Sequence, residues 1–205
     1  MTHRVDSIQL PHSTLGTHRR VLAHHFGQSG ARPKAYFQAS LHADEWPGML
    51  VADHLIRRLQ AADKQNAILG EVVVVPVANP IGLSQQVSGR FLGRYDLLDG
   101  GNFNRGFPDL AEATHKRVGD MLGDDPASNV GHVRQALRNA VQDLPIERER
   151  DGLVAALLGL SIDSDYVLDM HCDDEALLHI YASQTHRQTA VELGAELGAD
   201  VVLLE

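Results

Sequence analysis

The feature that most restricts the fold is a run of β-branched apolar residues, Glu71-Val-Val-Val-Val-Pro-Val-Ala78. A strand whose successive side chains are all apolar is buried on both faces, as in a parallel sheet with helices packed on it. Similar strands are expected at 34–41 and at 165–170. These runs favour an α/β architecture, in which sheet and helices share one core.

Helical segments alternate with these strands. Pro47 suits the first turn of a helix, because its missing N–H costs nothing there. Apolar residues then recur at helical spacing to about residue 60. Further helices are expected at 132–143, 148–160 and 185–197, and further strands at 177–183 and 199–204. The order predicts an α/β fold with a mixed, mostly parallel sheet and helices on both faces.

A long irregular segment, residues 79–110, interrupts this alternation with many glycines. A loop of such length inside a compact domain is usually functional or disordered. The stretch Gly123-Asp-Asp-Pro126 is expected to separate helices.

Composition limits the classes of function. The chain has 205 residues, enough for one domain with a substantial core. A formal net charge of -9 without a basic stripe argues against a nucleic-acid partner. No apolar run is long enough to span a membrane, and Cys172, the single cysteine, cannot form an internal disulfide. We therefore expect a cytoplasmic protein with no membrane partner; whether it is a homo-oligomer stays open.

Three residues form a candidate metal site. His42 follows the strand at 34–41, His171 follows the strand at 165–170, and Glu45 lies in the turn after His42. Sites in open α/β sheets form beyond the carboxyl ends of strands, so parallel neighbours would bring both imidazoles to one edge. Two histidines and one carboxylate leave a position for water, which is the catalytic pattern for zinc. Zinc lowers the pKa of that water and polarises a carbonyl.

Each of these residues also has a simpler explanation when taken alone. His42 could be a polar loop residue, Glu45 a carboxylate favoured by a helix dipole, and His171 an ordinary residue at a strand end. Their joint placement favours a site. The acidic turn at 173–175 could hydrogen-bond to the imidazoles or face solvent, and both interpretations stay open.

The spacing of these residues resembles a known superfamily. His42-Ala-Asp-Glu45, followed by Asp169-Met-His171, resembles the zinc carboxypeptidases, where H-x-x-E precedes a histidine by more than a hundred residues; here the gap is 171 − 45 = 126. Asn79-Pro-Ile-Gly82 is similar to that superfamily's Asn-Pro turn. Asp99-Gly-Gly-Asn-Phe-Asn-Arg-Gly-Phe-Pro108 resembles the N-R-x-F-P signature of the succinylglutamate desuccinylase/aspartoacylase branch. The resemblance runs from about residue 34 to Glu205, and the combination of motifs is specific.

The resemblance implies roles for the glycine-rich loop. Arg105 can bind a carboxylate with two parallel hydrogen bonds, and the resemblance assigns Asn104 and Arg105 to the substrate carboxylate. An upstream arginine should stabilise the oxyanion; Arg94 and Arg90 are the candidates. We favour Arg94, because it leads directly into the Asn104 loop. The alternative is a set of solvated arginines paired with the nearby aspartates 96, 99 and 109.

The resemblance also implies a general base, a glutamate well downstream of the last histidine. The candidates after His171 are Glu175, Glu192, Glu196 and Glu205. None fits well, and members of the resembled family carry a further C-terminal part. We therefore interpret residues 1–205 as the N-terminal portion of a single zinc-hydrolase catalytic domain that is C-terminally incomplete.

The function that the resemblance implies is zinc-dependent (Zn²⁺) hydrolysis of the amide bond of a small N-acyl amino acid. The residue pattern of the Asn102–Pro108 stretch, through this resemblance, favours an N-acetyl amino acid as substrate. Two alternatives remain: a zinc metallocarboxypeptidase acting on peptides, and a non-catalytic protein that binds zinc or ligand without a general base.

Overall fold

The computed structural model describes residues 2–11, 14–172 and 175–205. The chain divides into two compact units, Met1–His171 and Cys172–Glu205. Among the described residues, no helix is both long and apolar enough to cross a bilayer.

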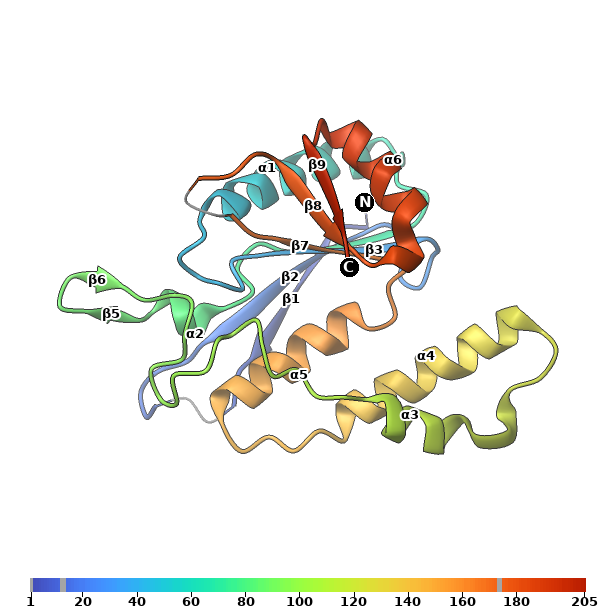
Figure 1. Cartoon of the computed structure of the whole chain (residues 1–205), viewed down its shortest axis with the longest axis horizontal. Helices are drawn as coiled ribbons and strands as arrows, with labels where there is room; N and C mark the ends of the chain where they lie inside the picture. The colour runs from blue at the N-terminus through green and yellow to red at the C-terminus, as the bar shows by residue number, and fades with distance from the viewer. Residues whose placement is uncertain (1, 12–13, 173–174) are drawn as a thin grey trace. The chain divides into compact units, whose positions relative to one another are not determined.

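The valine run forms β4 (Glu71–Val75), inside a five-stranded sheet of the first unit (Figure 1). The strand order is β1-β2-β4-β3-β7, and the other strands are β1 (Arg4–Gln9), β2 (Arg20–Phe26), β3 (Lys34–Ala39) and β7 (Tyr166–Met170). β3 pairs in parallel with β4 and β7, whereas β2 is antiparallel to β1 and β4. The sheet is therefore mixed, with its parallel part around β3.

Helices cover both faces of this sheet. Val73 and Val75 point into a cluster with Leu153 and Leu157 of α5 (Glu149–Ser161), while Val74 points into a cluster with residues of α1 (Pro47–Lys64). The three valines are 0% exposed, and burying such a side chain contributes about 1.5–3 kcal/mol. Figure 1 shows α1 and α5 on opposite sides of the sheet. The predicted α/β fold with a mixed sheet is confirmed.

Some boundaries differ from the prediction. β4 ends at Val75 rather than at 78, because Pro76 has no N–H to donate to a neighbouring strand. α4 (Pro126–Gln142) begins six residues before the expected 132. The Asp125 side chain accepts hydrogen bonds from the backbone of the first turn, and Pro126 occupies the first helical position. The expected break at 123–126 therefore contains the cap of a helix. α3 (Ala111–Val118) and a 3-10 turn (Gly119–Met121) precede it.

The segment 79–110 is irregular but held in place. It contains a short helix α2 (Pro80–Leu83) and a hairpin of β5 (Gln86–Val87) and β6 (Arg90–Phe91), which projects from the body of the unit in Figure 1. The following loop is closed by backbone hydrogen bonds from Asp96 N–H to the Gly101 carbonyl (2.8 Å) and from Phe103 N–H to the Arg94 carbonyl (3.1 Å).

The second unit is a small β-α-β element. β8 (His179–Ala182) and β9 (Val201–Leu204) pair in parallel, and η2 (Gln184–His186) and α6 (Arg187–Leu197) connect them. α6 ends at Gly198, whose φ of 69° is left-handed, as expected for a glycine cap.

Candidate metal centre

The centre lies beyond the carboxyl ends of β3 and β7. These strands are parallel neighbours, with Ala39 opposite Met170. The residues that follow each strand therefore reach the same edge of the sheet. His42 and His171 meet there, with their ring centroids 5.0 Å apart. Parallel pairing of the two strands is the condition under which the sequence places both imidazoles at one edge, and it is met.

The turn that carries His42 is fixed by two neighbours. The buried Asn79 side chain donates to the Leu41 carbonyl (2.9 Å) and accepts from the Gly82 N–H (2.8 Å). The Ala43 N–H donates to the Gly93 carbonyl (3.0 Å). A Cβ at Gly93 would lie 2.2 Å from the Asp44 backbone nitrogen, so this close approach requires glycine.

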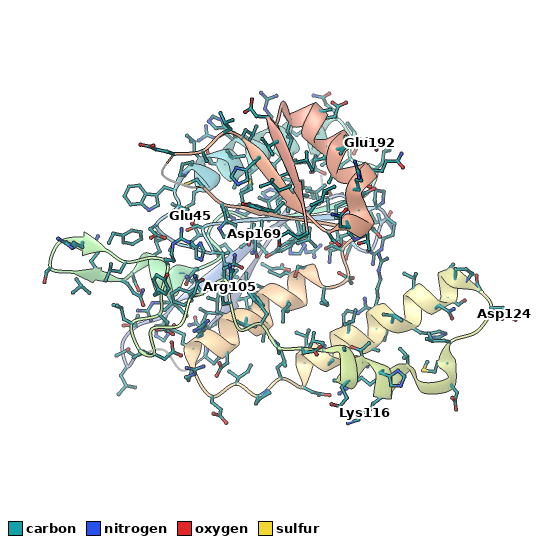
Figure 2. All side chains as sticks on the ribbon, in the orientation of Figure 1. Glu45, Arg105, Lys116, Asp124, Asp169 and Glu192 are labelled. Carbon is teal, nitrogen blue, oxygen red and sulfur yellow. The ribbon has the colours of Figure 1, made fainter. Side chains whose placement is uncertain are left out.

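The three predicted ligands converge on one point. Nδ1 of His42 lies 2.9 Å from one Glu45 carboxylate oxygen, and Nδ1 of His171 lies 2.9 Å from the other. The ligand atoms of the three residues all lie within 4.8 Å of one another, so the group could hold a metal ion. His42 and Glu45 are only 5% and 6% exposed. Figure 2 labels Glu45 within this cluster.

The outer nitrogens of both imidazoles have oxygen partners. Nε2 of His42 donates to Oδ1 of Asn102 (2.8 Å), and Nε2 of His171 donates to the Asp169 carboxylate (2.8 Å). Both acceptors place a proton on Nε2 and thus direct Nδ1 toward the centre. The hydrogen bond to Asp169 raises the pKa of His171. Burial acts to lower this pKa, and the nearby Glu45 carboxylate raises it further. A metal ion must displace any proton on the coordinating nitrogen.

The sequence-based prediction gave no role to Asn102 or Asp169. It considered the acidic turn at 173–175 instead, of which residues 173 and 174 lie outside the described residues. Alternation along a strand, which places residues i and i+2 on the same side, could have indicated Asp169 beside His171. Asn102 stands in the motif that contains Asn104, but its contact with His42 depends on the tertiary fold.

Arg94 reaches the centre from the segment after the hairpin. Its guanidinium donates to a Glu45 carboxylate oxygen at 2.6 Å, and its side chain is 37% exposed. Arg90, the other arginine considered for the oxyanion, is an exposed residue of β6. The arrangement brings one cationic donor to the ligand carboxylate.

The loop that carries the predicted carboxylate-binding pair lies beside the centre. Nδ2 of Asn104 lies 3.5 Å from Nε2 of His171. The Arg105 guanidinium donates to the Asn104 carbonyl (2.7 Å), and its side chain is exposed. Arg105 thus adjoins Asn104 in the chain and is accessible to solvent.

The glutamates considered as general base, residues 175, 192, 196 and 205, all belong to the unit Cys172–Glu205. Glu192 accepts a hydrogen bond from Gln188 (3.0 Å) along α6, which fits the expected solvated helix face.

The sequence matches the model of the succinylglutamate desuccinylase/aspartoacylase catalytic domain over residues 31–204. One curated relative, an N-alpha-acetyl-L-2,4-diaminobutyric acid deacetylase of Halomonas elongata, is 37% identical over 79 residues. That match covers 38% of this chain and 20% of the relative.

Solved structures share the fold. A protein of the succinylglutamate desuccinylase/aspartoacylase family from Shewanella amazonensis superposes with a TM-score of 0.77 at 25% identity, covering 91% of this chain and 51% of that one. A structure of the same class from Shewanella frigidimarina gives 0.78 at 23% identity, covering 93% and 52%. A carboxypeptidase A-like protein from Shewanella denitrificans gives 0.54 at 16%, covering 95% and 44%. The chain spans about half the length of these structures.

Proposed function

Because the chain belongs to the succinylglutamate desuccinylase/aspartoacylase catalytic domain family, we propose that it is a zinc-dependent hydrolase of the amide bond in a small N-acyl amino acid. The observation that carries the proposal is the convergence of His42, Glu45 and His171 at one sheet edge, with their ligand atoms within 4.8 Å of one another. We place the activity in the cytoplasm, since the sequence has one cysteine and hence no internal disulfide.

The donor set fits zinc. Two imidazole nitrogens and one carboxylate are the ligands of catalytic zinc sites that keep a position open. Both imidazoles present the same nitrogen, and each outer nitrogen is held by an oxygen acceptor. Such outer hydrogen bonds fix the ring orientation and raise the basicity of the ligand nitrogen. When bound, zinc supplies Lewis-acid activation of water and of the scissile carbonyl.

The proposal gives the chain's own residues separate tasks. Arg94, beside Glu45, places a guanidinium where negative charge develops on the carbonyl oxygen. Asn104 and Arg105 bind the substrate carboxylate, and their loop sets its distance from the centre. Fixing that distance aligns the amide for attack, which is the main contribution of a rigid substrate loop.

For the acyl group we propose acetyl. The curated relative from Halomonas elongata is a deacetylase of an N-acetylated amino acid. A panel of N-acetyl and N-succinyl amino acids, with short peptides that have a free carboxyl terminus, separates this substrate class from that of a peptidase.

The test combines metal content with turnover. We expect about one zinc per chain in the wild type and its loss in the double variant His42→Ala with His171→Ala. The double variant His18→Ala with His54→Ala removes the same number of histidines at exposed positions and should retain the metal.

Release of acetate from N-acetyl amino acids supports the proposal, and a carboxylate of this chain then serves as base. Stoichiometric zinc without turnover on the panel would indicate a metal-binding protein. Cleavage of peptides alone would indicate a carboxypeptidase. A folded wild type without zinc, judged by circular dichroism, would exclude the metal assignment.

A further inference from the structure

A largely buried arginine of α5, Arg150, binds the loop that carries Asn104 and Arg105. One guanidinium nitrogen of Arg150 donates to the carbonyl of Asn102 (2.6 Å) and to the carbonyl of Arg105 (3.0 Å). The other contacts the Asp99 carboxylate (3.4 Å), and the guanidinium carbon lies 5.5 Å from the centre of the Phe103 ring. The Arg150 side chain is only 12% exposed.

The two carbonyls that Arg150 binds bracket the functional part of the loop. Between them stands Asn104, whose amide lies beside His171. Asn102 itself accepts from Nε2 of His42 and, with the same oxygen, from the Asn104 N–H (2.8 Å). A displacement of this short segment therefore moves the partner of a metal ligand together with the predicted carboxylate-binding residues.

The contacts require an arginine at this position. A guanidinium presents several N–H donors in a fixed plane and can serve two carbonyls and a carboxylate together. An ammonium group is a compact point charge with no such planar arrangement. Glycine at position 101 leaves room for the guanidinium where it stands, because a Cβ at Gly101 would lie 2.2 Å from Nη1 of Arg150.

We propose that Arg150 is a positioning residue for the site: it fixes the Asn102–Arg105 segment, and thereby the orientation of His42 and the place of the substrate carboxylate. The substrate part of this inference rests on the proposed function, whereas the part concerning the loop and the metal ligand does not.

Arg148 provides a matched control. It contacts the same Asp99 carboxylate and also Asp151, and its side chain is 49% exposed. Within the described chain, no hydrogen bond joins it to the Asn102 or Arg105 carbonyl. Arg148→Met and Arg150→Met thus each remove one arginine from Asp99, but only the second releases the loop.

The experiment compares wild type, Arg148→Met, Arg150→Met and Arg150→Lys in three measurements: amide hydrogen exchange of residues 102–105, zinc affinity by competition with a chelator, and kinetics on N-acetyl amino acids. Arg150→Lys keeps the charge and serves if the methionine variant does not fold.

In both Arg150 variants we expect faster amide exchange in the loop. We also expect zinc affinity to fall about 3- to 10-fold, at or below the low end of the loss seen when a direct partner of a metal ligand is removed. KM should rise more than kcat falls, because the loop binds the substrate carboxylate. Arg148→Met should resemble the wild type in all three measurements.

Equal loop exchange and equal zinc affinity in Arg148→Met and Arg150→Met would overturn the assignment. Full function of Arg150→Lys, with exchange as in the wild type, would also overturn it, since charge alone would then suffice. If the wild type hydrolyses no N-acyl amino acid, the proposed function fails, while the exchange and zinc measurements still decide the role of Arg150.

Discussion

Asn79→Ala should destabilise the protein strongly, although Asn79 binds neither metal nor substrate. The Asn79 side chain is 0% exposed. Its amide donates to the Leu41 carbonyl and accepts from the Gly82 N–H, both in the interior. Alanine removes both partners at once and leaves a buried acceptor and a buried donor that water cannot reach.

The magnitude follows from these two groups. A buried polar group left without a partner costs about 1–3 kcal/mol, so two such groups predict a loss of about 2–6 kcal/mol in the free energy of unfolding. Because Leu41 precedes His42, the turn at the candidate metal site should shift as well. We expect zinc affinity to fall about 10-fold, as for other residues that support a metal ligand.

The assay is urea unfolding of the metal-free protein, followed by zinc titration. Asn129→Ala is the control, because Asn129 makes the same pair of bonds with the N–H (2.9 Å) and carbonyl (2.7 Å) of Gly123 in an exposed turn. Water can replace those bonds, so the loss should stay below about 1 kcal/mol. Equal losses in the two variants would refute the reasoning that burial makes Asn79 costly to remove.

Three further predictions concern other parts of the first unit. Gly93→Ala should lower zinc affinity at least ~10-fold, since its Cβ would lie 2.2 Å from the Asp44 nitrogen; unchanged affinity by titration would contradict the close packing of this turn. Arg105→Lys should raise KM for N-acetyl amino acids about 10-fold with little change in kcat, because a lysine cannot form two parallel bonds to a carboxylate; an unchanged KM would remove Arg105 from the site. Asp165→Asn should lower the free energy of unfolding by about 1–2 kcal/mol at neutral pH. Burial raises the pKa of Asp165, but hydrogen bonds from the Lys34 N–H and from arginines outweigh it and lower this pKa from 3.8 to about 2. This contribution is complete above pH 3.8 and is lost as the pH falls through 2, so urea unfolding of both proteins should converge there.

The sequence predicted the parts of the fold that depend on local pattern. The valine run of β4 is apolar on both faces because helices cover both faces, and Gly198 ends α6 as a left-handed cap. The start of α1 at Pro47 is confirmed, but the start of α4 was predicted six residues too late. The pattern predicts a break at 123–126, whereas Asp125 and Pro126 form the cap and first position of α4.

The candidate ligands could be predicted because His42 and His171 come after β3 and β7, and Glu45 lies in the turn after His42. Parallel pairing of the two strands then brings the three residues together. The sequence pattern did not indicate the residues that position these candidate ligands. Asn102 and Arg150 act through tertiary contacts between a loop and a helix, and no periodicity or short spacing in the sequence reports such a contact.

The separation of Glu45 and His171 in the chain has a consequence for folding. The residues between them include four strands and five α-helices of the first unit. β7, which carries His171 to the centre, is the last strand of its sheet to be synthesised. High metal affinity should therefore arise late on the ribosome, only after the chain has closed this long loop at an entropic cost. A nascent chain that ends before β7 would offer His42 and Glu45 alone. Under the proposed function, zinc would bind mainly to chains that have already aligned β7 with β3, and would make that alignment harder to reverse.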